Sequence, residues 1–179
     1  MTLRVRPARP ADATAIAAVY GPHVTGSVAS FEGEPPDAAE VARRMAFRPR
    51  LPWLVAERDA VVVGFADASP HRSRAAYRWS VDTSVYLTAQ ERGRGTGRAL
   101  YDVLLPLLRD LGLVTAHAAI ALPNPASVAL HETVGFSPVG VYPAVGFKHG
   151  AWRDVGWWRL ALVEPPAAPA EPREWVPEP

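Results

Sequence analysis

The stretch from residue 84 to residue 100 constrains the fold of this 179-residue chain more than any other. β-Branched and aromatic residues at its start predict a strand, a glycine-rich turn follows, and apolar spacing then predicts a helix to about Leu111. Gly93, Gly95 and Gly97 carry no Cβ, so successive backbone N–H groups of the turn can converge on an anion. The positive end of the helix dipole points at the same place. The turn therefore predicts a pyrophosphate-binding site, and neighbouring side chains add positive charge to it: Arg92, Arg94 and Arg98.

Several interpretations of this turn compete. A dinucleotide fingerprint needs G-x-G-x-x-G, but Arg98 stands where the third glycine belongs. A Walker loop needs a Lys followed by Ser or Thr, and the turn has no Lys. The pattern that is present is R-x-x-G-x-G, from Arg92 to Gly97, and it resembles the acetyl-CoA signature of the GCN5-related N-acetyltransferases. A solvated, arginine-rich turn that only caps a helix stays open as the alternative.

Composition limits the class of protein. With 49% hydrophobic residues the chain can form one domain with a sizeable core. A net charge of +1, with acidic and basic residues interspersed, gives no reason to expect a nucleic acid or a membrane surface as partner. The chain has no cysteine, which excludes a thiol nucleophile, a disulfide framework and a zinc-thiolate site. Since no apolar run approaches the roughly 20 residues of a membrane span and no signal-peptide core is visible, we expect a cytoplasmic protein.

The order of expected elements indicates an α/β or mixed α+β fold around one central sheet. A first helix is expected after Asp12 and should end at Gly21-Pro22, and a second should be opened by a capping box of Asp37 and Glu40. Asn124 and Pro125 are the expected cap and first residue of a short helix that ends at Gly135. Strands are expected at residues 3–7, 53–56, 61–66, 79–87, 114–122, 139–141 and 155–163, with an irregular stretch before the last.

The sequence predicts one domain over residues 1–163 and a separate tail over residues 164–179. The tail is rich in Pro, Ala and Glu, so we expect it to lie outside the core and to be disordered.

A second motif makes a family resemblance specific. The segment from Asn124 to Phe136 reads N-x-x-S-x-x-L-x-x-x-x-G-F and follows the glycine turn by about 30 residues, as in the GNAT superfamily of N-acetyltransferases. His131 stands where most members have Tyr. Together with residues 81–86 and 146–155, this pattern resembles the phosphinothricin and methionine sulfoximine acetyltransferases, over roughly residues 2–163.

The resemblance implies a mostly antiparallel sheet with splayed strands, flanked by helices, and direct acetyl transfer from acetyl-CoA to an amine. It implies a homodimer and no metal. It also implies a set of residues that hold the cofactor: Val85, Tyr86, Leu87, Arg92, Gly93, Arg94, Gly95, Thr96, Gly97, Arg98, Asn124 and Ser127.

Two residues are candidates for the proton transfer. The attacking amine must be neutral, but a free α-amino group has a pKa near 8, so a general base is useful. His131 is one candidate, and Asp82, where this branch normally has Glu, is the other. Asp is shorter by about 1.5 Å, and a misplacement of roughly 1 Å can cost about 10²-fold in rate. We favour Asp82 as a binder of the amine and His131 as the proton carrier; Asp82 acting through a water, and His131 as an ordinary hydrogen-bonded helix residue, stay open.

Recognition of an amino-acid analogue needs a partner for its α-carboxylate. Arg72 and Arg78 match basic positions of the methionine sulfoximine branch, and a guanidinium suits a carboxylate well. Phe31, Tyr86 and Trp152 are the expected apolar walls. Arginines on a loop are often merely solvated, which remains the alternative.

Three functions are compatible with these patterns. The first is acetylation of a small amino-acid analogue such as phosphinothricin or methionine sulfoximine. The second is acetylation of another amine, such as an ordinary amino acid, a polyamine or a protein N-terminus, although the basic loop 70–78 argues against a peptide or polyamine. The third is a non-catalytic acyl-CoA-binding module, which the Asp at position 82 keeps open.

Overall fold

The computed structural model describes residues 2–177 and places them around one seven-stranded sheet. The strand order is β1-β2-β3-β4-β5-β7-β6, and every neighbouring pair is antiparallel except β4 and β5, which are parallel. The predicted mixed sheet is therefore confirmed. The strands are β1 (Leu3–Pro7), β2 (Trp53–Arg58), β3 (Val61–Pro70), β4 (Ser80–Leu87), β5 (Thr115–Ala121), β6 (Ser137–Lys148) and β7 (Ala151–Ala161).

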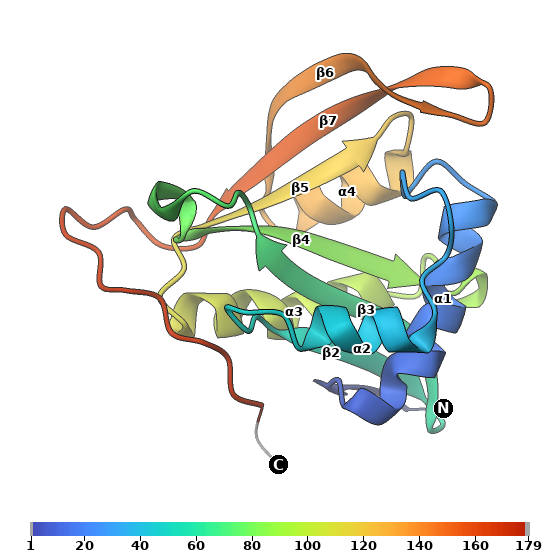
Figure 1. Cartoon of the computed structure of the whole chain (residues 1–179), viewed down its shortest axis with the longest axis horizontal. Coiled ribbons are helices and arrows are strands. Elements are labelled where there is room, and N and C mark those ends of the chain that lie inside the picture. Colours follow the sequence, from blue (N-terminus) through green and yellow to red (C-terminus); the bar gives the residue numbers. More distant parts are fainter. Residues whose placement is uncertain (1, 178–179) are drawn as a thin grey trace.

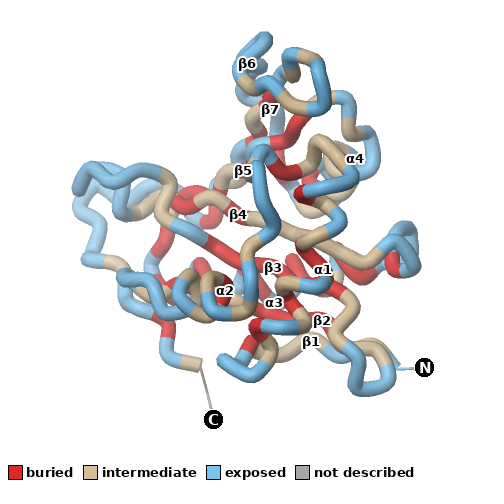
Figure 2. Tube along the Cα trace, turned by 45° about the vertical axis from the view of Figure 1, so that its right-hand side comes forward, coloured by how far each residue is buried: buried red, intermediate tan, exposed pale blue. Residues whose placement is uncertain are grey.

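Helices cover both faces of the sheet (Figure 1). On one face, α1 (Ala13–Thr25) and α2 (Ala38–Met45) pack against Val55 and Phe65. On the other face, α3 (Thr96–Asp110) buries Leu100, Leu104 and Leu108, and α4 (Pro125–Thr133) lies beside β5. Figure 2 shows the central strands buried between these layers, while β6 is mostly exposed. Within the described residues, no helix is long and apolar enough to cross a membrane.

The two parallel strands separate soon after they meet. β4 pairs with β5 only from Ser80 to Asp82, opposite Thr115 to His117. Beyond this point β4 continues beside β3 to Leu87, while β5 continues beside β7 to Ala121. From residue 83 onward, the backbone groups of β4 that point toward β5 therefore face an opening in the sheet rather than a neighbouring strand.

Two elements differ from the sequence prediction. Helix α1 does not end at Gly21-Pro22 but continues to Thr25, because Val24 in the extra turn is buried in the core and Pro22 removes only one N–H group. The stretch expected to be irregular is a long hairpin of β6 and β7. Register shifts at Pro138/Gly140 and Tyr142/Gly146 interrupt the two-residue alternation, so the sequence does not show it as a strand.

The C-terminal segment also differs from the prediction. Residues 164–177 form no helix or strand, but Trp175 is buried in the main core cluster. Its backbone N–H donates to the carbonyl oxygen of Arg50 at 2.8 Å, and that of Arg173 donates to Leu111 at 2.8 Å. The indole carries enough apolar surface to hold this proline-rich segment against the domain. The remaining predicted tail residues, 178 and 179, lie outside the described residues.

We expect Trp175→Ala to lower the free energy of unfolding by about 3 kcal/mol, because it removes a buried aromatic side chain. Urea denaturation measures this loss. The matched control is Val176→Ala, since Val176 is 79% exposed and should change stability little. Equal effects of the two variants would mean that the segment does not stabilise the domain.

Candidate active site

A cavity of about 660 Å³ lies at the opening between β4 and β5. It extends from the end of β4, past the glycine turn, to the first turns of α4. Of the residues predicted to hold the cofactor, all except Arg94 line it: Val85, Tyr86, Leu87, Arg92, Gly93, Gly95, Thr96, Gly97, Arg98, Asn124 and Ser127. Its size suits an extended cofactor, and their role in binding one stays a prediction.

The glycine turn has the backbone geometry of an anion cradle. Gly93 and Gly95 have φ values of 71° and 81°, in the left-handed region that favours glycine, and a Cβ at either would meet only open space. Helix α3 begins directly after them at Thr96. A Cβ on Gly97 would lie 2.9 Å from Leu130, so this glycine allows α4 to approach α3 closely. Arg94, which does not line the cavity, pairs with Glu91 at 3.5 Å.

The carboxylate of Glu91 holds the glycine turn in place, a role that the sequence analysis missed. Its buried carboxylate accepts two hydrogen bonds from Arg58, both 2.8 Å long, and one from the Thr96 hydroxyl at 2.6 Å. The Arg58 guanidinium, followed by the Thr96 hydroxyl, lowers the pKa of Glu91 to about 2. The ion pair therefore ties the turn to the end of β2. Because Arg58 and Glu91 are far apart in the sequence, no local pattern indicates the contact.

His131 lines the cofactor cavity, but both of its ring nitrogens are engaged. Nδ1 lies 2.7 Å from the carbonyl oxygen of Ser127, which can only accept, so Nδ1 carries the hydrogen. Nε2 then accepts from the Tyr101 hydroxyl at 2.8 Å. Burial lowers the pKa of His131, so the ring is neutral near pH 7. Tyr101 in turn lies 3.1 Å from the Thr83 hydroxyl of β4, and neither residue was singled out from the sequence.

His23 is a further cavity residue that the sequence analysis missed. Its Nε2 lies 2.8 Å from the carbonyl oxygen of Leu87, at the end of β4. The residue was overlooked because the helix was expected to end before it. One of the backbone groups predicted to contact the pantetheine arm is therefore already bonded to this imidazole.

Asp82 lies where β4 and β5 begin to separate. Its Oδ1 is 2.6 Å from Nδ1 of His71, and its side chain is 29% exposed. Burial raises the pKa of Asp82, and the contact with His71 opposes that effect. The His71 ring stacks on His117 with centroids 4.2 Å apart. The carboxylate predicted from the sequence is thus held by a histidine that the sequence analysis did not select.

These three residues are also the ones that could hold a metal ion. One donor atom from each of His71, Asp82 and His117 lies within 4.8 Å of the others. The imidazole planes are only 20° apart, so their in-plane lone pairs run side by side rather than toward one point. Of the three, His71 and Asp82 are hydrogen-bonded to each other, whereas the buried Nδ1 of His117 has no hydrogen-bond partner among the described residues. The expectation of no metal stays a prediction.

The predicted substrate residues do not converge on one cavity. Tyr86 lines the cofactor cavity and also a second cavity on the α1–α2 side of the sheet. The Arg72 guanidinium lies 5.5 Å from the centre of the Trp157 ring, and Arg78 pairs with Glu171 of the C-terminal segment at 2.5 Å. Phe31 lies against Gly146 of the β6–β7 hairpin, and exposed Trp152 packs on Phe147 of the same hairpin. Their assignment to the substrate stays a prediction.

Comparison with known proteins agrees with this geometry. The sequence model of the acetyltransferase (GNAT) family matches residues 17–136. The chain belongs to the acetyltransferase (GNAT) family. It is 37% identical to the phosphinothricin N-acetyltransferase of Streptomyces viridochromogenes over 95% of this chain and 94% of the relative. It is 33% identical to the L-methionine sulfoximine/L-methionine sulfone acetyltransferase of Salmonella typhimurium, over 90% and 96%.

A solved structure extends the agreement to three dimensions. The GNAT superfamily phosphinothricin acetyltransferase from Sinorhizobium meliloti, in complex with AcCoA, superposes with a TM-score of 0.90 at 38% identity, covering 96% of this chain and 95% of that one. The predicted fold, family and branch are therefore confirmed, and the chain is an N-acetyltransferase.

We expect Glu91→Gln to weaken the binding of coenzyme A and to lower the free energy of unfolding, because it leaves the Arg58 charge without its ion-pair partner. Isothermal titration calorimetry and urea denaturation measure the two effects. Asp110→Asn, at an exposed site outside the cavity, is the control for net charge. Unchanged affinity in Glu91→Gln would contradict the role of this carboxylate in shaping the turn.

Proposed function

We propose that the protein transfers an acetyl group from acetyl-CoA to the α-amino group of a small amino acid or amino-acid analogue of the phosphinothricin or methionine sulfoximine type. The observation that carries the proposal is the cofactor cavity at the β4–β5 opening, with a partly buried carboxylate, Asp82, at the point of separation. The names of the relatives support an amino-acid-like substrate.

The reaction proceeds in one ternary complex. The lone pair of the amine attacks the thioester carbonyl carbon, a C–N bond forms, the C–S bond breaks, and coenzyme A leaves as a thiolate. The backbone of residues 85–87 holds the pantetheine arm, and the glycine turn holds the pyrophosphate. One proton leaves the ammonium before attack, a second leaves the same nitrogen as the amide forms, and the thiolate takes up one proton, so that one proton is released to solvent overall.

We assign the removal of the ammonium proton to Asp82 and a positioning role to His131. The Asp82 carboxylate is partly exposed, its pKa is raised toward the working pH, and one oxygen is held by His71. His131 has a lowered pKa and both nitrogens bonded, so it is a poor acceptor. Its bond to Tyr101 supports Thr83 and hence the backbone of β4. The assignment reverses the preference that the sequence alone suggested.

The pH dependence of kcat/KM tests this assignment. A carboxylate base must be ionised, so the wild-type activity should fall as the pH drops through the raised pKa of Asp82. We expect Asp82→Asn to lower kcat by about 10²-fold or more and to abolish this acidic limb. His131→Ala should keep the limb and lose stability instead. A limb that disappears in His131→Ala but persists in Asp82→Asn would return the base role to His131.

Two other functions make different predictions. A non-catalytic module would bind acetyl-CoA but release no thiol with any amine. An enzyme for another amine would acetylate a polyamine or a peptide N-terminus faster than phosphinothricin, methionine sulfoximine or free amino acids. Acetyl-CoA turnover with this panel separates the three functions. Turnover of the amino-acid-like members is the expected result, and failure with all of them would overturn the proposal.

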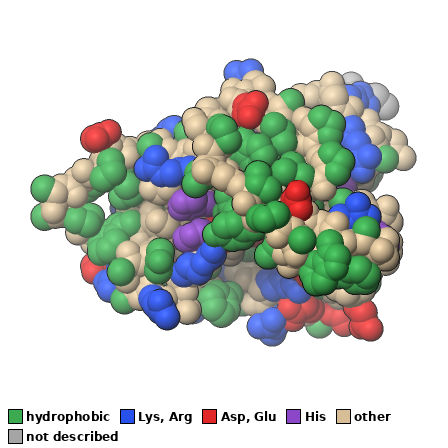
Figure 3. Space-filling view, turned by 90° about the horizontal axis from the view of Figure 1, so that it is seen from above, with side chains coloured by type: hydrophobic (Ala, Val, Ile, Leu, Met, Phe, Trp, Pro, Cys, Tyr) green, Lys and Arg blue, Asp and Glu red, His purple; other side chains and the backbone are tan. Residues whose placement is uncertain are grey.

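We further propose that the enzyme is a cytoplasmic homodimer that acts without a metal. The absence of cysteine from the sequence supports the cytoplasm. The β6–β7 hairpin supports a dimer, because it carries apolar side chains that are each more than half exposed: Val139, Val141, Tyr142, Val145, Phe147 and Trp152. Figure 3 looks down on this side of the molecule, where hydrophobic side chains gather among polar ones.

Analytical ultracentrifugation tests the dimer. We expect the wild type to sediment as a dimer and Val141→Asp to sediment as a monomer, because a charge would be buried in the interface. Val176→Asp is the control, since Val176 is exposed outside the hairpin. A monomeric wild type at micromolar concentration would contradict the proposal.

A further inference from the structure

A second cavity of about 380 Å³ lies between α2 and the strands β3 and β4. Asp67 of β3 lines it and is only 9% exposed. Among residues 2–177, no hydrogen bond or ion pair reaches its carboxyl group. A buried carboxyl group that faces a cavity without a partner is unusual, because burial of an unpaired charge is costly.

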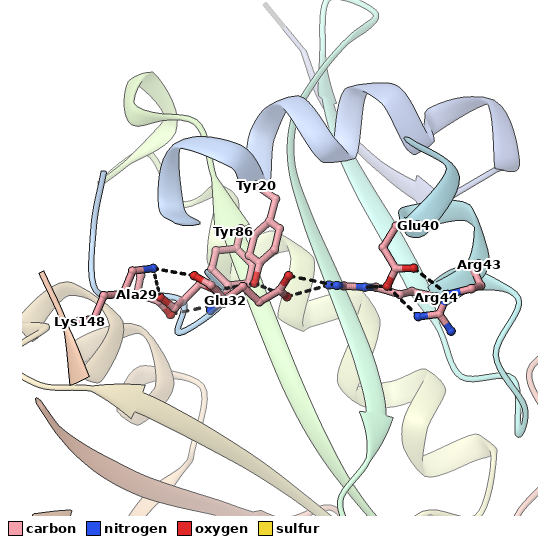
Figure 4. Close-up of polar contacts among 9 residues, drawn as sticks. Tyr20, Ala29, Glu32, Glu40, Arg43, Arg44, Tyr86 and Lys148 are labelled. Carbon is pink, nitrogen blue, oxygen red and sulfur yellow. Dashed lines mark hydrogen bonds and ion pairs between the residues drawn. The ribbon is translucent and has the colours of Figure 1, made fainter. Parts of the chain in front are cut away.

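The cations around this cavity are already committed to other carboxylates (Figure 4). Arg44 donates to Glu32 at 2.7 and 3.0 Å and to Glu40 at 2.7 Å. Arg43 donates twice to Glu40, at 2.6 and 2.7 Å. The two arginines and two glutamates are paired with one another, so the carboxyl group of Asp67 is the acidic group of the wall that has no cation in contact with it among the described residues.

Asp67 lies close to Asp82, the residue proposed to remove the ammonium proton. In the β3–β4 ladder it is opposite Ser84, so Asp82 is its diagonal neighbour on the same face, at a Cα separation of about 7–8 Å. Ser84 and Tyr86 line both this cavity and the cofactor cavity. A substrate whose amine is at Asp82 can therefore extend toward Asp67.

The walls between these points suit an alkyl chain that ends in a cation. The rings of Trp53 and Phe65 are stacked with centroids 5.9 Å apart, and Phe65 and Tyr86 with centroids 5.5 Å apart, so a row of aromatic faces lines the cavity. Aromatic faces attract cations as well as methylene groups. Burial raises the pKa of Asp67 to about 7, and an approaching cation would favour its ionised form. The charged groups that face it are Arg43, Arg44 and Glu32.

We propose that Asp67 is a specificity-determining residue that binds a cationic side-chain group of the amine substrate. Among free amino acids, the preferred substrate is one whose side-chain guanidinium or ammonium lies about six bonds, roughly 7 Å, from the reacting nitrogen. The proposal rests on the proposed acetyltransferase function and names the substrate class of the same site. The basic loop does not oppose it, because Arg72 and Arg78 are not among the residues that line this cavity.

L-Arginine and L-citrulline form the matched pair for the test, since they share shape and length and differ in the charge of the terminal group. With the purified full-length chain and acetyl-CoA, thiol release gives kcat/KM for each. We expect the wild type to prefer L-arginine by about tenfold or more, and Asp67→Asn to reduce the ratio to near one by losing L-arginine turnover. L-Citrulline turnover should change little.

Asp59→Asn is the control variant, because it removes the same charge from an exposed turn between β2 and β3. Asp67→Ser provides a second variant with a neutral side chain if Asp67→Asn folds poorly. A wild type without preference between the two amino acids, or a preference that survives in both Asp67 variants, would overturn the proposal.

Direct binding separates this proposal from the acetyltransferase function itself. If the wild type acetylated no amine, the proposed acetyltransferase function would be wrong. Calorimetric titration with agmatine would still measure whether the cavity that contains Asp67 binds a cation. Agmatine binding that is lost in Asp67→Asn but kept in Asp59→Asn would support a cation site without turnover. No agmatine binding to the wild type would overturn it. Acetylation of phosphinothricin without any effect of Asp67→Asn on the arginine-to-citrulline ratio would leave the function intact and refute the role of Asp67.

Discussion

The separation of β4 from β5 is the constraint on which the rest of the structure depends. A parallel pair that stops after three residues leaves strand backbone groups without a partner in the middle of a sheet, which costs free energy unless something else occupies the gap. The protein fills part of it with side chains, since His23 reaches Leu87 and the Thr83 hydroxyl lies 3.1 Å from the carbonyl oxygen of His117. The remaining backbone groups of β4 are available to an extended cofactor, so the same defect in the sheet creates the binding site.

The two cavities meet at this opening, and the first is proposed to bind the cofactor and the second the amine. The cofactor side is built from backbone and glycine, with Glu91 and Arg58 holding the turn in place. The second cavity, proposed to take the amine, is lined by side chains: aromatic rings, two arginines with a glutamate, and the carboxyl group of Asp67, while Asp82 lies beside it on the same face of the sheet. Asp82 has a histidine partner and is 29% exposed, whereas Asp67 is 9% exposed and has no hydrogen-bond or ion-pair partner among residues 2–177. Neighbouring acidic residues on one sheet face can thus serve different purposes.

Much of this arrangement could be predicted from the sequence where the pattern is local. The glycine turn, the Asn124 cap and the alternation along β4 each reflect a short stretch of chain, and the structure has each of them at its expected position. Long-range contacts were not predictable. Nothing near Arg58 indicates Glu91, nothing near Asp82 indicates that His71 faces it, and the composition of the C-terminal segment conceals the anchoring effect of Trp175. The residue types of His131 and Asp82 predicted roles in proton transfer, but the hydrogen-bond partners on which the proposed division of those roles rests are not visible in the sequence.

Lys148, near the end of β6, connects two segments that the sequence keeps far apart. Its ammonium donates to the carbonyl oxygens of Val24, Ser30 and Glu32, at 2.6, 2.6 and 3.1 Å, and so holds the connection between α1 and α2. Figure 4 shows Lys148 beside Glu32. That connection carries Glu32, which lines the second cavity, between α2 and the strands β3 and β4. A shift of the outer hairpin would therefore pull on the cavity through one flexible side chain. Substitutions in the β6–β7 hairpin would then change which amines the enzyme prefers, although every residue that contacts the amine or the cofactor stayed the same.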